Sequence, residues 1–315
     1  MDFRTRVPIG KEQPQMDYDS RVFLTGSCFV ENIGEKLQFY QFRNLQNPLG
    51  ILFHPFAIEN LCSRLNSDFR YSEADIFYHN ERWHCFEAHS GLSHPGKDEF
   101  LENLNRGLES SRSFLKEASH IILTPGTSWY YRHLEQEKNV ANCHKIPQKE
   151  FSKKIASVEE VKQSLQSSVR NLQGLAPEAT IIFTVSPVRH LKDGMVQNQR
   201  SKAHLIAAVQ DLISEMQDLH YFPSYELLID ELRDYRFYAE DMLHPNVTAI
   251  NYVWGKFSEA WISAEARRVM QRVEKIRSGL AHRPFNPNSE AHKSFLRRLQ
   301  SDIDKLQKEF PHILF

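Results

Sequence analysis

The sequence predicts an α/β fold, a three-layer α/β/α sandwich around a parallel sheet, followed by a C-terminal helical appendage. Short apolar segments rich in β-branched residues alternate with longer amphipathic segments, the pattern of strands separated by helices. The runs 120–124 and 180–185 each contain three consecutive apolar residues, at 121–123 and 181–183, as expected for strands covered on both faces. With 315 residues, 41% of them hydrophobic, the chain can bury a large core.

Three of five predicted strands lie in the first half of the chain. Residues 21–25 form the first, and a helix over 27–38 carries Glu31, Glu35 and Lys36 on its outer face. Residues 39–45 form the second strand, and a helix over about 97–118 leads to the third at 120–124. Between the second strand and this helix lies a segment of about 71–95 that contains Trp83 and several histidines. We expect this segment to form an inserted β-hairpin or lid that shapes a substrate pocket.

The second half continues the alternation with a helix over 158–173, a strand over 180–185, a helix over 199–216 and a strand over 219–224. A helix over 261–278 then stops near Gly279. After Pro284 and Pro287, a charged helix over 290–310 follows. We expect this hairpin to pack on the core or on a second copy of the chain, forming a homodimer; the alternative is a solvated cap. The predicted domains are therefore 1–265 and 266–315.

A Thr-Gly-Ser-Cys-Phe turn, Thr25 to Phe29, joins the first strand to the first helix. Ser27 is exposed by such a turn, and the adjacent helix N-terminus favours a developing negative charge. Far downstream, Asp241 and His244 supply an acid and an imidazole three residues apart. A serine hydroxyl needs a base, and the base needs a group that fixes its tautomer. The three residues therefore indicate a serine hydrolase.

The order of these residues resembles the SGNH or GDSL hydrolase superfamily, because Ser27 is early and the Asp-x-x-His is late. No G-x-S-x-G is present, which argues against an ordinary α/β-hydrolase. The block Gly26 to Val30 resembles the GSCFA family of that superfamily, with Val30 where the family name has alanine. Four further blocks are similar to the same family: 47–55, 124–129, 142–145 and 186–190. The resemblance spans roughly 20–260 and implies a flavodoxin-like sheet with strand order 2-1-3-4-5.

The resemblance also implies site residues. Ser27 is the nucleophile, Asp241 and His244 complete the triad, and Gly50 is a backbone donor of the oxyanion hole. The superfamily places Gly-x-Asn in the third block, where this chain has Gly126, Thr127 and Ser128. The missing amide is replaced either by the hydroxyl of Thr127 or Ser128, or by Asn142 from elsewhere.

Each candidate also has a purely structural interpretation. Ser27 alone is better explained as a helix N-cap, and only the neighbouring blocks favour the nucleophile. Asp241 can cap the following helix, and His244 can be a buried, hydrogen-bonded histidine. Arg189 can bind an anion or form an ion pair that fixes a loop. His144, with nearby cysteines and His89, has zinc-ligand chemistry but no standard spacing, so we expect no metal.

Charge and composition exclude several classes of function. The chain has 39 basic and 40 acidic residues, so no basic stripe suggests nucleic acid as a partner. No apolar run approaches the roughly 20 residues of a membrane span, and the first twenty residues lack the apolar centre of a signal peptide. Four cysteines without close pairing are expected to be free thiols, and we expect a cytoplasmic location.

These observations predict a serine esterase or deacylase without a cofactor, acting on an O-acyl ester of a small molecule or glycan. An O-acyltransferase with the same triad is the alternative within that chemistry. A non-catalytic glycan- or protein-binding module is the alternative from another class.

Overall fold

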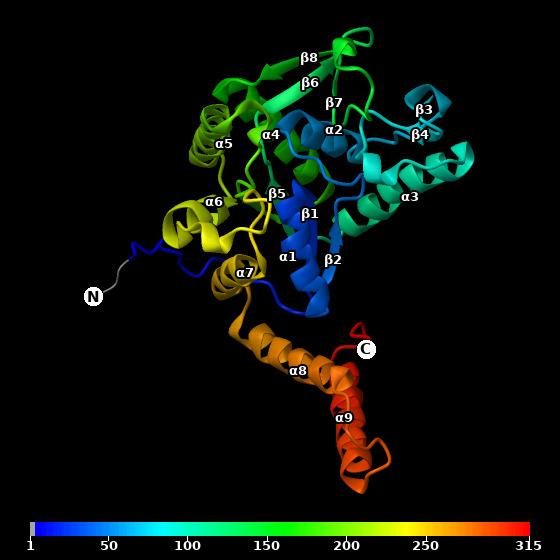
Figure 1. The fold of residues 1–315 in the computed structure, drawn as a ribbon, viewed down its shortest axis with the longest axis vertical. Coiled ribbons are helices and arrows are strands. Elements are labelled where there is room, and N and C mark those ends of the chain that lie inside the picture. Colours follow the sequence, from blue (N-terminus) through cyan, green and yellow to red (C-terminus); the bar gives the residue numbers. More distant parts are fainter. Residues whose placement is uncertain (1–3) are drawn as a thin grey trace.

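The structure, a computed structural model, describes residues 4–315. Its centre is a sheet of five parallel strands in the spatial order β10-β9-β5-β1-β2, which confirms the predicted strand order (Figure 1). The strands are β1 (Arg21–Gly26), β2 (Arg43–Gln46), β5 (His120–Thr124), β9 (Thr180–Phe183) and β10 (Leu219–Tyr221).

Helices cover both faces of this sheet, so the three-layer α/β/α prediction is confirmed. One layer contains α2 (Pro55–Leu65), α3 (Lys97–Leu115), α4 (Val158–Leu175) and α5 (Met195–Glu215); the other contains α1 (Cys28–Phe39) and α7 (Val247–Trp261). Alternate strand residues enter the two cores, Phe23 and Ile121 on one side, Val22 and Ile122 on the other. Full burial of each such side chain contributes roughly 1.5–3 kcal/mol.

Two local features differ from the prediction. Helix α2 was not predicted; it begins after His54, whose Nδ1 accepts a hydrogen bond from Ala57 N. A three-stranded antiparallel sheet also follows β5. Its strands are β6 (Trp129–His133), β7 (Lys138–Val140) and β8 (Phe151–Ile155), in the order β7-β6-β8. The segment around 71–95 contains the antiparallel hairpin of β3 (Phe77–His79) and β4 (Arg82–His84).

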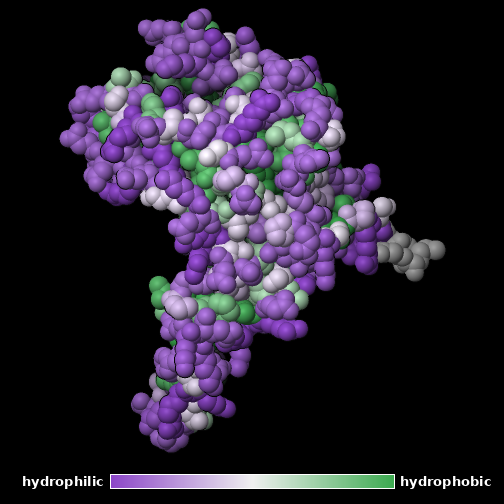
Figure 2. Space-filling model, turned by 180° about the vertical axis from the view of Figure 1, so that it is seen from behind, coloured by the Kyte–Doolittle hydropathy of each residue, from purple (hydrophilic) through white to green (hydrophobic). Residues whose placement is uncertain are grey.

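The C-terminal hairpin consists of α8 (Ala264–Ala281) and α9 (Glu290–Glu309), which project from the main body (Figure 1). The predicted continuous helix over 261–278 is broken at Ile262, because Met16 bonds on both sides of it, to Trp261 O and Ser263 N. Leu299, Ile303 and Leu306 of α9 are buried. The outer surface of the hairpin is mostly hydrophilic (Figure 2). Dimer formation through these helices stays a prediction.

Within residues 4–315, no helix is both long and apolar enough to span a bilayer. The four cysteines, Cys28, Cys62, Cys85 and Cys143, are free, as expected from their spacing.

Candidate active site

Ser27 lies at the carboxyl end of β1, at the first turn of α1, where open parallel sheets bind ligands. Its side chain caps α1 by accepting a long hydrogen bond, 3.4 Å, from Phe29 N. Ser27 is 0% exposed. The helix-cap interpretation of this serine is therefore confirmed, through a long bond, and the nucleophile interpretation stays a prediction.

Gly26 is required by the close approach of β1 to β5. It is paired with Thr124, and its φ is +144°. A β-carbon at Gly26 would lie 2.3 Å from the carbonyl oxygen of Thr124, closer than any real contact. The glycine therefore fixes how Ser27 leaves the sheet.

Backbone hydrogen bonds join four of the five sequence blocks that resemble the family, and also the turn that carries His244. The bonds run around the sheet end from Leu52 N to Gly26 O, Gly126 N to Phe53 O, Ser186 N to Pro125 O and Arg189 N to Leu243 O, and the block 142–145 is not part of this series. In addition, Asn47 Oδ1 accepts from Gly26 N at 3.0 Å. Segments far apart in the chain therefore form one hydrogen-bonded site.

Asp241 and His244 form a pair of the kind that orients a catalytic base. His244 Nδ1 is 2.6 Å from Asp241 Oδ2, while Asp241 Oδ1 accepts from the N–H groups of Leu243 and His244. These backbone bonds, together with the imidazole, lower the pKa of Asp241 to about 2. The carboxylate is therefore ionised at neutral pH. It bonds to Nδ1 of His244, so Nε2 is the ring nitrogen that does not contact Asp241. Both side chains are about half exposed, at 46% and 50%.

Arg189 contacts the Asp241–His244 turn, and within residues 4–315 it forms none of the ion pairs considered from sequence. Its guanidinium lies over the rings of Tyr238 and Tyr235, at 4.2 Å and 5.1 Å from their centroids. It also donates to Met242 O at 3.3 Å. The side chain thus fixes the loop that carries the imidazole.

Lys202 of α5 is a site residue that the sequence did not indicate. It is 1% exposed, and its Nζ donates to Gly126 O at 2.6 Å and to Ser186 O at 2.5 Å. Burial lowers its pKa to about 7. Lys202 therefore ties the loop after β5 to the loop after β9. No local signal marks it, because a lysine in an amphipathic helix predicts a solvent-facing position.

Gly126 separates Ser27 from His190. A β-carbon at Gly126 would lie 3.0 Å from Ser27 Cβ and 3.1 Å from His190 Nε2. The two side chains therefore border the same small space. Burial, with Lys202, His244 and Lys192 nearby, lowers the pKa of His190 to about 3, so its imidazole is neutral.

The residues expected to donate to an oxyanion are already engaged in this structure. Gly50 N bonds to Asn47 O in a turn, and the Ser27 N–H extends the sheet ladder to Thr124 O. Thr127 and Ser128 bond through their hydroxyls to Ser201 of α5, at 2.8 Å and 3.1 Å. A role for either hydroxyl in binding an oxyanion stays a prediction.

Asn142 and His144 lie on a neighbouring loop. Asn142 Oδ1 accepts from His144 N at 2.8 Å. The Nε2 atom of His144 forms a hydrogen bond with Cys85 O at 2.7 Å, and its Nδ1 atom lies 3.1 Å from Nδ1 of His84. Burial lowers the pKa of His144 to about 4. It is therefore a buried, satisfied histidine. Across residues 4–315, no cluster of three metal-ligating side chains occurs.

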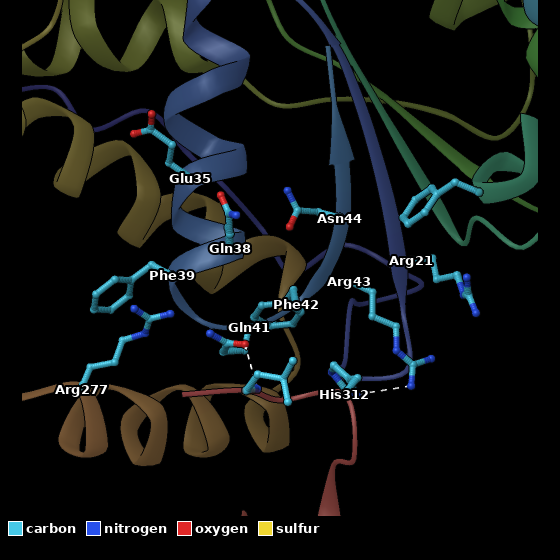
Figure 3. A pocket seen from close by; sticks show the side chains of 12 residues that line it. Arg21, Glu35, Gln38, Phe39, Gln41, Phe42, Arg43, Asn44, Arg277 and His312 are labelled. Carbon is cyan, nitrogen blue, oxygen red and sulfur yellow. Dashed lines mark hydrogen bonds between the residues drawn. The ribbon is translucent and has the colours of Figure 1, made fainter. Parts of the chain in front are cut away.

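A cavity of about 390 Å³ adjoins Phe53 on the outer side of the site. It is lined by aromatic, amide and basic groups, including Tyr131, Asn142 and Lys192. The Phe53 ring is 5.9 Å from that of His190, and the Phe53 carbonyl accepts from Gly126 N. A larger cavity of about 820 Å³ lies near Arg21 and Arg43, at the amino ends of β1 and β2 (Figure 3). It is remote from the site residues, and we do not assign the site there.

The site is closed in this structure. Within the described chain, no hydrogen bond joins Ser27 Oγ to His244, and Ser27 has no exposed surface. His190 borders Ser27 across Gly126, and His244 is among the groups that act electrostatically on His190. Contact between Ser27 and His244 therefore stays a prediction.

Two protein-family models match the chain. A model of the GSCFA family matches residues 21–257, and a model of the GSCFA domain protein, C-terminal domain, matches residues 273–315. No curated protein matches the chain.

Solved structures that resemble the chain include three esterases of low sequence identity. A carbohydrate esterase family 3 protein from Talaromyces cellulolyticus is 7% identical, covering 81% of this chain and 99% of its own, with a TM-score of 0.36. The acetyl xylan esterase Est2A from the rumen bacterium Butyrivibrio proteoclasticus is 11% identical over 88% and 66%, with a TM-score of 0.41. An acetyl esterase mutant with acetate ion is 9% identical over 82% and 99%, with a TM-score of 0.36. Because the first family model spans well over half of the sequence, this chain belongs to the GSCFA family.

Proposed function

We propose that the protein is a serine esterase or deacylase in which Ser27, His244 and Asp241 form the triad. The observation that carries the proposal is the Asp241–His244 pair, whose loop is bonded to the block after β9 at the end of the sheet that holds Ser27. An ionised carboxylate on Nδ1 fixes the tautomer in which Nε2 accepts a proton. This arrangement is the one that activates a serine hydroxyl.

The chemistry follows from these positions. Ser27 Oγ attacks the ester carbonyl carbon while His244 Nε2 takes the hydroxyl proton. The tetrahedral intermediate collapses, the bond to the alcohol oxygen breaks, and His244 returns the proton to that oxygen. Water, deprotonated by the same imidazole, then attacks the acyl-Ser27 ester and releases the acid.

The substrate class that we propose is a small O-acyl ester, with an acetylated sugar as the first compound to assay. The support is the 390 Å³ cavity beside Phe53, whose aromatic and polar lining suits a sugar ring. The full burial of Ser27 favours a second candidate, an O-acyltransferase. Exclusion of water from an acyl-enzyme lets a sugar hydroxyl take the acyl group instead.

The test is labelling with a fluorophosphonate probe, followed by peptide mapping of the adduct, with wild type beside Ser27→Ala. We expect an adduct on Ser27 that is absent from the variant. Loss of the cap lowers the free energy of unfolding by about 1 kcal/mol at most, since the bond is long. Cys28→Ala is the matched control and should still be labelled.

Asp241→Asn provides the second arm of the same test. The wrong tautomer of His244 is then favoured, and we expect the labelling rate to fall by up to about 10⁴-fold. Product analysis with an added sugar acceptor separates hydrolysis from acyl transfer. If folded wild-type protein neither takes up the probe nor hydrolyses an ester small enough to reach Ser27, the triad is refuted and the binding-module alternative is supported.

A further inference from the structure

His190 has a buried nitrogen without a partner. Its Nε2 atom is inaccessible, and among residues 4–315 it has no hydrogen-bond partner. Leaving such a group unpaired typically costs about 1–3 kcal/mol, so buried polar atoms of this kind usually serve a ligand or a reaction. The main chain of the same residue is well held, because His190 N donates to Asn198 Oδ1 at 2.8 Å.

The unpaired nitrogen faces the nucleophile. His190 Nε2 and Ser27 Cβ lie on two sides of the position that a Gly126 side chain would occupy, 3.1 Å and 3.0 Å from it. The absence of a side chain at Gly126 is therefore what leaves space between them. An oxygen atom attached to a carbon under attack by Ser27 would enter this space.

The side chains that act electrostatically on His190 are basic. Lys202 and Lys192 both act on the imidazole electrostatically, as does His244. These cationic or potentially cationic groups disfavour a second proton on His190, so the ring stays neutral and keeps a single N–H. A neutral imidazole can donate a hydrogen bond to a developing oxyanion without supplying the proton to it.

We propose that His190 completes the oxyanion hole, with Nε2–H donating to the carbonyl oxygen of the bound ester as that oxygen becomes negatively charged. The inference rests on the proposed esterase function. His190 thus takes the role that the third block leaves open, since Thr127 and Ser128 bond instead to Ser201. Cys28, the first residue of α1, provides a backbone N–H at the helix end as the companion donor.

The structure argues against His190 as the base that takes the Ser27 proton. His244 has a carboxylate on Nδ1 at 2.6 Å, and that carboxylate stabilises the imidazolium formed in the reaction. In the described chain, His190 has no such carboxylate partner, and Lys202 opposes its protonation. The two histidines therefore have separate roles, one as base and one as hydrogen-bond donor.

The experiment compares His190→Ala and His190→Gln with wild type. It measures the rate constant of Ser27 labelling by a fluorophosphonate and kcat/KM for p-nitrophenyl acetate. Removal of one oxyanion donor lowers kcat by about 10²–10³-fold in other serine hydrolases, and we expect a loss of this size for His190→Ala. Glutamine retains an N–H donor but cannot act as a base, so His190→Gln should recover at least tenfold of that loss. His282→Ala, an exposed histidine on the C-terminal hairpin, is the matched control.

The outcomes separate the two proposals. Absence of both a Ser27 adduct and p-nitrophenyl acetate hydrolysis in wild type refutes the esterase function itself. A labelled wild type with His190→Ala reacting at the same rate refutes the role of His190 alone. If His190→Gln is as inactive as His190→Ala while both are folded by circular dichroism and urea melting, hydrogen-bond donation is refuted as well. An unchanged acid limb of the pH profile in His190→Gln supports the donor role, because the base is then still His244.

Discussion

Replacement of Gly126 by alanine tests the geometry of the site at its narrowest point. The added methyl group would meet Ser27 Cβ at 3.0 Å, His190 Nε2 at 3.1 Å and Phe53 O at 3.4 Å. Optimal carbon contacts are about 3.5–4.0 Å, so the neighbours must retreat by roughly half an ångström. The methyl group would also fill the space that we assign to the oxyanion.

The expected loss is large in activity and small in stability. Misplacement of reacting groups by about 1 Å can cost about 10²-fold, and loss of an oxyanion contact costs about 10²–10³-fold. We therefore expect kcat/KM and the labelling rate of Ser27 to fall by at least about 10²-fold. Overpacking costs about 1–3 kcal/mol, but Gly→Ala returns about 0.4–1 kcal/mol through the unfolded state. The free energy of unfolding should fall by no more than about 2 kcal/mol.

The assay is p-nitrophenyl acetate hydrolysis together with fluorophosphonate labelling and urea unfolding. Gly255→Ala is the control, because its β-carbon would meet nothing within 4 Å in the middle of α7. This control should keep full activity and gain up to about 1 kcal/mol in stability. A Gly126→Ala variant as active as Gly255→Ala would refute the placement of the reaction between Ser27 and His190.

Three further changes test the surroundings of the site. Asn47→Gly removes the acceptor of Gly26 N and should lower the unfolding free energy in urea by about 1–3 kcal/mol, whereas Asn47→Asp keeps the acceptor and should lose less. Arg189→Gln should lower kcat/KM about tenfold by loosening the turn around Met242, with Arg189→Lys intermediate because it retains the cation over the tyrosine rings. Burial lowers the pKa of His54 to about 4, so the folded state binds fewer protons than the unfolded state between about pH 6.5 and 4, and stability falls as pH falls through that window. The full shift corresponds to roughly 3 kcal/mol, and His54→Asn, which keeps the helix cap, should show a shallower decline of Tm on acidification.

The central sheet could be predicted because its signal is local. The strand 120–124 has the predicted bounds, since all five of its residues are buried and the three at its centre are β-branched or aliphatic. The antiparallel sheet of β6, β7 and β8 could not be predicted in the same way. Its strands are short and contain charged and aromatic residues, and their pairing, such as Trp129 with Ile155, depends on contacts far apart in the chain.

The site residues also differ in whether the sequence alone could indicate them. Ser27, Asp241 and His244 could be proposed from sequence because residue types at fixed spacing carry their chemistry. Lys202 could not be, because its burial results from two carbonyl groups, on Gly126 and Ser186, that belong to other elements. His190 stood within a block that resembles the family, yet its role depends on Gly126, 64 positions away in the chain, which only the fold brings into contact with it.

The hydrogen bonds between loops explain why the sequence signals of this protein occur as separate blocks. Ser27 is held by Gly26, and Gly26 is fixed on both sides, its carbonyl by Leu52 N and its N–H by Asn47. The following links lead in turn through the blocks 124–129 and 186–190 to the loop of His244. A substitution in one block is therefore expected to shift the adjacent, hydrogen-bonded block, and through that block the position of Ser27. We expect pairs of substitutions in adjacent blocks to be non-additive in kcat/KM, and pairs in distant elements such as α7 and the site loops to be additive.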